Sequence, residues 1–274
     1  MKIIEQFTQG KAGGTDINDD CISVSDNFIA VIDGSTSRVG HELKGLPIGQ
    51  FASNILSREV ANLQADIDAR AAVDKLTEIL KNEAEAAAKE EGLNFGGPEF
   101  FPSAALLVYS AARREIWRVA DSTFVMDGRA NCRVFPQERT WMELRRAYIC
   151  AEIARGEKEE DLIAVDPTQD MLTSIIRNFK VFANYDGPYG YGVINGSRVP
   201  DAHIEVVSAA AANEITFASD GYPEVEPTLE ETEKYLLHVV KQDPLMYKLH
   251  PQVKGVKPGN VSFDDRSYIR FKPG

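Results

Sequence analysis

Aspartate residues stand at the ends of short apolar runs in this sequence. The first clear case is the run 28–32, which passes directly into Asp33 and Gly34. A β-branched run bounded by turn residues is typical of a strand that is buried on both faces. A carboxylate at the mouth of such a strand, beside a glycine that a ligand can approach closely, suits a hard cation. Taken alone, Asp-Gly also marks an ordinary turn, so a single occurrence decides nothing.

The same arrangement recurs along the chain, which makes it informative. Three more apolar runs end at Asp121, Asp220 and Asp264, and the triplet 18–20, Asn-Asp-Asp, precedes a fifth run. Aspartate is depleted inside strands, so its repeated placement at strand ends predicts one shared cluster. Carboxylate oxygens suit Mg2+ and Mn2+, and such ions can bind phosphate even in an acidic protein. Two such ions can lower the pKa of a bridging water for attack on phosphorus, with no protein nucleophile.

The elements that must position this cluster are strands in antiparallel pairs. Runs 21–24 and 28–32 predict a hairpin that brings Asp19 or Asp20 near Asp33. Other strands are expected at 3–7, 103–110, 115–120, 123–126, 131–135, 193–194, 202–208, 214–218 and 268–271. Helical spacing predicts two amphipathic helices within 47–92, broken near 63–68, and further helices at 140–155, 172–182 and 228–241. Helices inserted between strand pairs indicate an α+β layered fold.

Composition narrows the class of protein. The chain has 274 residues, 43% of them hydrophobic, and no Pro/Gly/Ser-rich linker, which favours one domain over residues 1–274. A formal net charge of -12 argues against nucleic acid or an anionic membrane surface as the main partner. No run approaches the roughly 18 apolar residues of a membrane span, and no signal peptide is apparent, so we expect a cytoplasmic protein. Cys21, Cys132 and Cys150 are expected to be reduced and mostly buried.

In their order along the chain, these aspartate motifs resemble those of the metal-dependent protein phosphatases, the PPM or type 2C family. The motifs are Asn-Asp-Asp at 18–20, Val-Ile-Asp-Gly at 31–34, Val-Ala-Asp-Ser at 119–122, Ala-Ser-Asp-Gly at 218–221 and Asp-Asp-Arg-Ser at 264–267. The resemblance covers 18–271 and is to the single-domain bacterial type. It implies a four-layer α-β-β-α sandwich, in which two antiparallel β-sheets are flanked by helix pairs. It also implies hydrolysis of phosphoserine or phosphothreonine in proteins with two Mn2+ or Mg2+ ions.

The resemblance assigns roles to individual residues at the metal site. Asp33 would bridge both ions and the Gly34 carbonyl would bind one of them. Asp220 and Asp264 would hold the other ion. Asp121 would help Asp220 to bind a weaker third ion.

The acidic pair of the first motif has more peripheral roles in the resemblance. Asp19 would be a metal ligand at a position where the family usually has Glu, and its shorter side chain would make that contact through water. Asp20 would support the ligands from behind. With Asp33, Asp220 and Asp264, Asp19 completes the set of four aspartates that we expect to carry catalysis.

Besides Asp19, two positions depart from the family pattern, Thr15 and Ala120. Thr15 stands where the family usually has a phosphate-binding Arg, so the substrate clamp is missing or comes from elsewhere, with Lys11 and Arg38 as candidates. Ala120 replaces the Gly that usually precedes Asp121, a change expected to be tolerable. His41 follows the Asp33-Gly34 turn closely enough to reach the metal site as a general acid.

Two other functions compete with the protein phosphatase. The missing Arg suits a phosphatase of the same fold that acts on a small phosphorylated metabolite. A catalytically weak member of the fold, used as a binding or regulatory module, is the third reading. Loop-like composition at 187–192 and 243–259 indicates segments that border substrate access.

Overall fold

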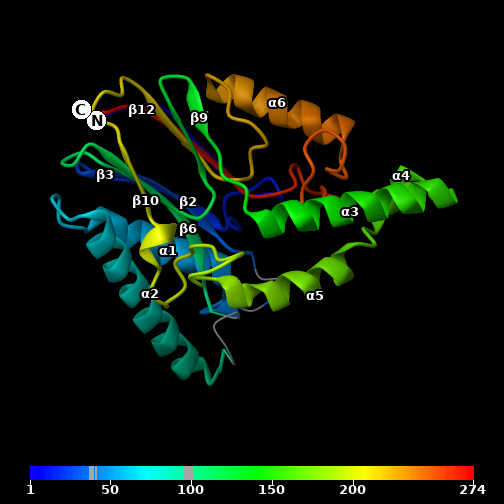
Figure 1. Cartoon of the computed structure of the whole chain (residues 1–274), viewed down its shortest axis with the longest axis horizontal. Helices are drawn as coiled ribbons and strands as arrows, with labels where there is room; N and C mark the ends of the chain where they lie inside the picture. Colours follow the sequence, from blue (N-terminus) through cyan, green and yellow to red (C-terminus); the bar gives the residue numbers. More distant parts are fainter. Residues whose placement is uncertain (37–39, 41, 96–100) are drawn as a thin grey trace.

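The computed structural model describes residues 1–36, 40, 42–95 and 101–274. The two chain ends lie side by side at one end of the molecule (Figure 1). They do so because β1 (Lys2–Gln9) pairs antiparallel with β12 (Arg266–Lys272), with Lys2 opposite Lys272. The first and last strands therefore belong to one sheet.

Two five-stranded antiparallel sheets form the centre of the described structure. We call the first the β1 sheet; its order is β1, β12, β11 (Ile215–Ala218), β8 (Thr123–Met126) and β9 (Arg129–Asn131). The second, the β3 sheet, has the order β10 (Glu205–Ser208), β7 (Glu115–Val119), β6 (Ala104–Ser110), β3 (Phe28–Gly34) and β2 (Asp20–Val24). A small separate hairpin consists of β4 (Glu42–Leu43) and β5 (Leu46–Pro47).

Strand β3 is covered on both faces, as its unbroken apolar run predicts. Ile29 and Val31 point between the two sheets, where they pack with Phe217 and Ile269 of the β1 sheet. The alternate residues of β3 belong to the core beneath the helices. Because successive side chains of a strand point to opposite faces, one continuous run supplies two cores. Its end, at Asp33 and Gly34, is thereby held in a rigid element.

Helices cover the outer faces of both sheets, which gives four layers (Figure 1). Helices α1 (Ile48–Ala61) and α2 (Ala69–Glu91) lie on the β3 sheet. The break between them ends at Asp68, whose side chain accepts a hydrogen bond from Ala71 N at 2.8 Å as an N-cap. Helix α6 (Leu229–Gln242) lies on the β1 sheet through Leu236 and Val239. The expected fold class, a four-layer α-β-β-α sandwich, is confirmed.

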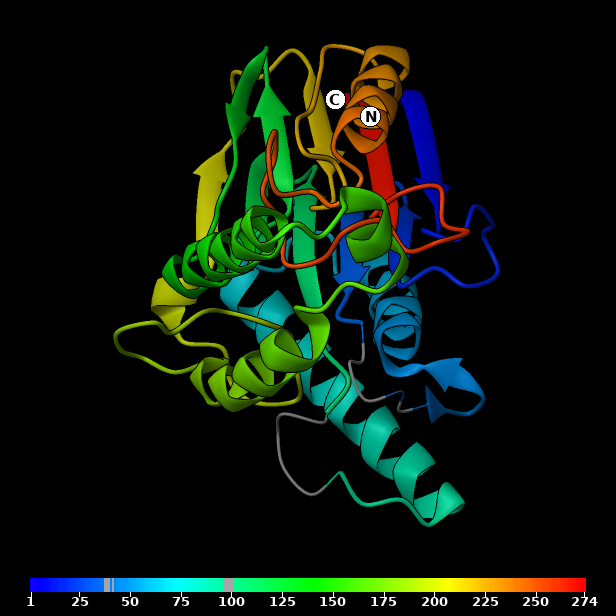
Figure 2. The same ribbon diagram turned by 90° about the vertical axis from the view of Figure 1, so that its right-hand side faces the viewer.

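A further group of helices lies beyond the end of the sandwich that is opposite the chain termini (Figures 1 and 2). It consists of α3 (Pro136–Arg155), α4 (Glu159–Ala164) and α5 (Gln169–Phe179), with 3-10 turns at Lys180–Phe182 and Asp201–His203. Buried Arg145 of α3 donates to Leu245 O at 2.6 Å and to Asp166 Oδ2 at 2.6 Å. Helix α3 is thereby joined to the 243–259 loop, and the two border the same end of the strands.

Several expected elements differ in the structure. Of the strand expected at 131–135, only Asn131 belongs to a strand, as the last residue of β9. Helix α3 begins soon after it, at Pro136. Proline suits the first helical position because its missing N–H would have no partner there. The strand expected at 193–194 is only an isolated bridge between Ile194 and Ala104. Helix α4 was not expected; the other boundaries move by a few residues.

The cysteines correct one expectation. All three are free, but only Cys21 is partly buried, whereas Cys132 and Cys150 are exposed. The prediction of mostly buried thiols was therefore wrong, since Cys132 precedes α3 and Cys150 lies in its last turns, both at the surface. Within the described ranges, no helix has the length and apolar character needed to cross a membrane.

Candidate active site

The strand ends bring the predicted aspartates to one end of the sandwich. Asp20, the first residue of β2, lies directly opposite Asp33 near the end of β3. Asp220 follows β11 and Asp121 follows β7, each after a buried strand. Asp264 stands two residues before β12. Distant motifs meet here because antiparallel pairing places the exits of β3, β7 and β11 beside the entrances of β2 and β12.

A cavity of about 450 Å3 opens at this end. Six of the residues singled out from the sequence line it: Lys11, Asp33, Gly34, Asp121, Asp220 and Asp264. Asp19 and Asp20 are buried behind its wall, with 5% and 4% of their surfaces exposed. The wall also includes residues of α3, α5 and the 243–259 loop, so that loop does border the cavity, as expected. Of the 187–192 loop, Tyr191 lines it too.

Gly34 is required by close packing behind the cavity. A Cβ added there would stand 2.2 Å from the Gly49 carbonyl oxygen and 2.6 Å from the Asp19 carbonyl oxygen. The Gly34 N–H donates to Asp19 O at 3.0 Å. Glycine therefore allows β3, the Asp19 backbone and the start of α1 to touch at the site.

One part of the cluster, which we call the acidic half, contains Asp33, Asp121, Asp220 and Glu138. Burial, followed by the charges of Asp220 and Asp20, raises the pKa of Asp33 well above its usual range. Burial and the charges of Asp264 and Asp121 raise the pKa of Asp220 to about 7. The pKa of Glu138 is raised by burial and by Asp121. These carboxylates repel one another, and this repulsion adds to burial in raising their pKa values.

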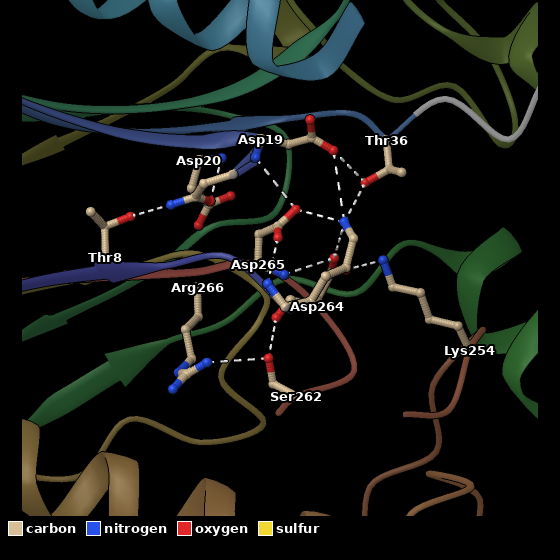
Figure 3. Close-up of polar contacts among 11 residues, drawn as sticks. Thr8, Asp19, Asp20, Thr36, Lys254, Ser262, Asp264, Asp265 and Arg266 are labelled. Atoms are coloured by element: carbon tan, nitrogen blue, oxygen red, sulfur yellow. Dashed lines mark hydrogen bonds and ion pairs between the residues drawn. The ribbon is translucent and has the colours of Figure 1, made fainter. Parts of the chain in front are cut away.

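The other part, the lysine-bound half, contains Asp19, Asp264 and Asp265 with Lys11 and Lys254 (Figure 3). Lys11 Nζ lies 2.6 Å from Asp265 Oδ2, 3.6 Å from Asp264 Oδ1 and 3.8 Å from Asp19 Oδ2. Lys254 Nζ pairs with Asp264 Oδ2. Burial alone would raise the pKa of Asp264, but Lys254 and Lys11 outweigh it and lower that pKa. The carboxylates of this half therefore already have cationic partners.

Solved structures with the same architecture include bacterial phosphatases. One, titled as a bacterial serine phosphatase, is 13% identical, with a TM-score of 0.51 over 98% of this chain and 97% of its own. Another, the serine/threonine phosphatase Stp1 from Staphylococcus aureus, is 14% identical, with a TM-score of 0.51 over 98% and 93%. This chain has their fold. No family model matches the sequence, and a search of curated proteins finds no match either.

Within this phosphatase fold, the expected substrate clamp is not at Thr15. Thr15 is exposed and is not among the residues that line the cavity, whereas Lys11 is. The other candidates, Arg38 and His41, lie outside the residues that the structure describes. Lys11 is therefore the candidate cation from the sequence that the structure places at the cavity.

Ala120 occupies a conformation that favours glycine. Its φ is +77°, in the left-handed region, where an alanine costs about 1 kcal/mol relative to glycine. The substitution of the usual Gly is thus accommodated with strain beside Asp121. Ala120 also lines the cavity, so the strain lies at the site itself.

Sequence reasoning assigned no role at the site to Glu138 or Lys254, nor to Asp265, which it named only within the motif 264–267. Glu138 lies in the first turn of α3, where its Oε2 accepts a hydrogen bond from Phe135 N at 2.9 Å. Proline at 136 with Glu138 two residues later is a helix-start signal that could have revealed it. Lys254 comes from an irregular loop, and no local signal marks it.

The donor chemistry of the acidic half fits a divalent metal. Its four side chains are all carboxylates, the ligands that Mg2+ and Mn2+ prefer, and their mutual repulsion would be relieved by a cation. Asp20 supports the same conclusion, since its Oδ2 is buried without a hydrogen-bond partner among the described residues. Among those residues, however, no three His, Cys, Asp or Glu side chains converge closely enough to form a ready-made metal site. A bound ion would have to draw them together.

Proposed function

We propose that this chain is a metal-dependent phosphoric monoester hydrolase that removes phosphate from phosphoserine or phosphothreonine in proteins. The observation that carries the proposal is the acidic half. Buried carboxylates from separate strand ends face one cavity, in a fold shared with bacterial serine/threonine phosphatases. Burying carboxylates that repel one another lowers the stability of the fold. A divalent ion bound between them would relieve that repulsion.

Asp33, Asp220 and Asp121 are the residues that would hold Mn2+ or Mg2+, together with the Gly34 carbonyl. A divalent ion bound there supplies Lewis acidity and positive charge at the phosphate. The motifs predict two ions and a weaker third, with Asp220 and Asp264 as the ligands expected for the second. Asp19 and Asp20 would act from behind the cavity wall, by holding the backbone and side chains that face the ions.

The rest of the cavity would bind and orient the substrate. Lys11 and Lys254 would attract the phosphate dianion to the aspartates, which would otherwise repel it. Phe135 and Tyr191 pack with ring centroids 5.6 Å apart on the cavity wall and would exclude water from the ester. We place the protein in the cytoplasm with phosphorylated proteins as substrates.

The first test is hydrolysis of p-nitrophenyl phosphate and of a phosphothreonine peptide with Mn2+, with Mg2+ and with excess chelator. We expect turnover only with metal, and a loss of roughly a thousandfold in kcat/KM in Asp33→Asn. Asp26→Asn is the matched control, because Asp26 is exposed in the turn that precedes the same strand. Turnover that survives in the chelator or in Asp33→Asn would overturn the proposal.

A small phosphate ester is the second candidate substrate, because the cavity has unused polar groups. Trp141 Nε1 and Gln137 Oε1 are buried without hydrogen-bond partners within the described part of the chain, and both residues line the cavity. A buried donor and a buried acceptor suit a compact ligand with a planar amide-like group. Comparing kcat/KM for phosphopeptides with that for phosphorylated nucleosides and other small esters separates the two candidates. Metal binding without turnover of any ester would instead favour a binding module.

A further inference from the structure

Asp264 is one of the two carboxylates, with Asp220, that the motifs assign to a second metal ion, and both of its oxygens are already engaged. Oδ2 pairs with Lys254 Nζ. Oδ1 accepts a hydrogen bond from Asp265 N at 3.0 Å and lies 3.6 Å from Lys11 Nζ. A divalent ion at Asp264 would therefore have to displace Lys254, and it would stand beside a second ammonium group.

Lys11 is held in this position at two points. Its backbone N–H donates to Asp265 Oδ1 at 2.7 Å, and its Nζ donates to Asp265 Oδ2 at 2.6 Å. The Lys11 Nζ also donates to Thr36 Oγ1 at 3.2 Å, and Thr36 in turn donates to Asp19 Oδ2 at 2.7 Å (Figure 3). The Asp265 carboxylate thus holds both the backbone N–H and the ammonium group of Lys11, so the ammonium group has a fixed position in the cluster.

The charges of this half are nearly balanced. Three carboxylates, Asp19, Asp264 and Asp265, face two ammonium groups, which together have the charge of one divalent ion. The side chains of Lys11 and Lys254 are only 24% and 23% exposed, so their interactions are partly shielded from solvent screening.

We propose that Lys11 and Lys254 take the place of the second divalent ion, so that the chain binds a single ion tightly, at the acidic half. This inference rests on the proposed function only in expecting a divalent ion there at all. The two ammonium groups then provide the positive charge that faces the phosphate beside that ion. The same arrangement accounts for Thr15, since a phosphate clamp at that position is replaced by lysines that line the cavity.

Calorimetric titration of the full-length, metal-stripped protein with Mn2+ tests the inference directly. We expect the wild type to bind one ion, with any second site at least about tenfold weaker. Lys254→Met keeps the length of the side chain and removes its charge, so it should tighten the second site at least about tenfold. Lys44→Met is the matched control: it removes an exposed ion pair to Glu90 of 2.7 Å and should leave both sites unchanged.

A second pair of variants keeps the test decisive if Lys254→Met folds poorly. Lys254→Arg retains the cation and should still bind one ion, whereas Lys11→Met should tighten the second site. Two ions bound by the wild type with similar affinity would overturn the inference. So would a second site that neither Lys254→Met nor Lys11→Met tightens.

The outcome separates this inference from the proposed function, because ion stoichiometry is measured without substrate. One tight ion that is lost in Asp33→Asn, with no phosphatase turnover, would leave the inference standing and remove the proposed function. Metal-dependent turnover with two equal ions would do the reverse.

Discussion

Asp220 and Asp264, one from each half of the cluster, are in opposite electrostatic states. In the acidic half, burial and neighbouring carboxylates raise the pKa of Asp220 to about 7. In the lysine-bound half, Lys254 and Lys11 outweigh burial and lower the pKa of Asp264. The carboxylates belong to one site, and both residues line one cavity. The chemistry of an aspartate in this protein is therefore decided by its neighbours and not by its place in a motif.

The two halves also illustrate two ways of neutralising a buried carboxylate: by a lysine of the chain itself or by a bound metal ion. A covalently attached lysine is always present, whereas a metal ion is present only when its concentration exceeds its dissociation constant. The lysine-bound half should therefore be stable without added metal. The acidic half should gain stability when metal binds.

Disturbing the close backbone packing at Gly34 should have the largest effect on stability. Gly34→Ala would place a Cβ 2.2 Å from the Gly49 carbonyl oxygen, where backbone must move because no flexible side chain can give way. We expect a loss of about 3 kcal/mol or more in the free energy of unfolding, measured by denaturant titration. Gly14→Ala is the control, since the nearest atom to its Cβ is 4.0 Å away. Equal stability of the two variants would show that the packing at Gly34 is not tight.

Removing one carboxylate from each half should change stability in opposite directions. Asp264→Asn leaves Lys254 without its partner and should lower the free energy of unfolding by about 1–2 kcal/mol in metal-free buffer. Asp220→Asn removes a repelled buried charge and should raise it by about 1 kcal/mol at pH 8. Thermal and denaturant unfolding in chelator measure both. Changes of the same sign would break the contrast between the halves.

A further expected effect is a pH dependence that belongs to the acidic half. The pKa of Asp220 rises from 3.8 to about 7 on folding, so the folded protein binds the extra proton between these values. Its contribution to stability is therefore full below about pH 4 and is lost as the pH rises through about 7. Asp264 has a lowered pKa, so its contribution is lost only as the pH falls below the usual range of an aspartate.

Unfolding midpoints measured from pH 4 to 8 in chelator check this prediction. The wild type should lose more stability over that range than Asp220→Asn, and Mn2+ should reduce the difference. A wild-type slope that matches the variant would show that Asp220 titrates normally.

The local pattern of apolar residues was enough to predict the strands and helices that form the core. The apolar run before Asp33 indicated a strand buried on both faces, and it packs in two cores. The helix pair within 47–92 and the break near 63–68 followed from apolar spacing alone. The start of α3 was missed because Pro136 and Glu138 were not read as a helix start, which also hid Glu138 from the site.

The sequence by itself determined the layered fold and the aspartates at the strand ends, because apolar periodicity and turn residues act over a few neighbouring positions. Only the tertiary structure decided which of those aspartates have cationic partners. Lys11 and Asp265 are separated by 254 positions, and Lys254 reaches Asp264 from an irregular loop. No periodicity connects such residues, since their contact depends on how β1, β12 and the 243–259 loop end at the same place. The charge balance of the site is therefore a property of the packed chain.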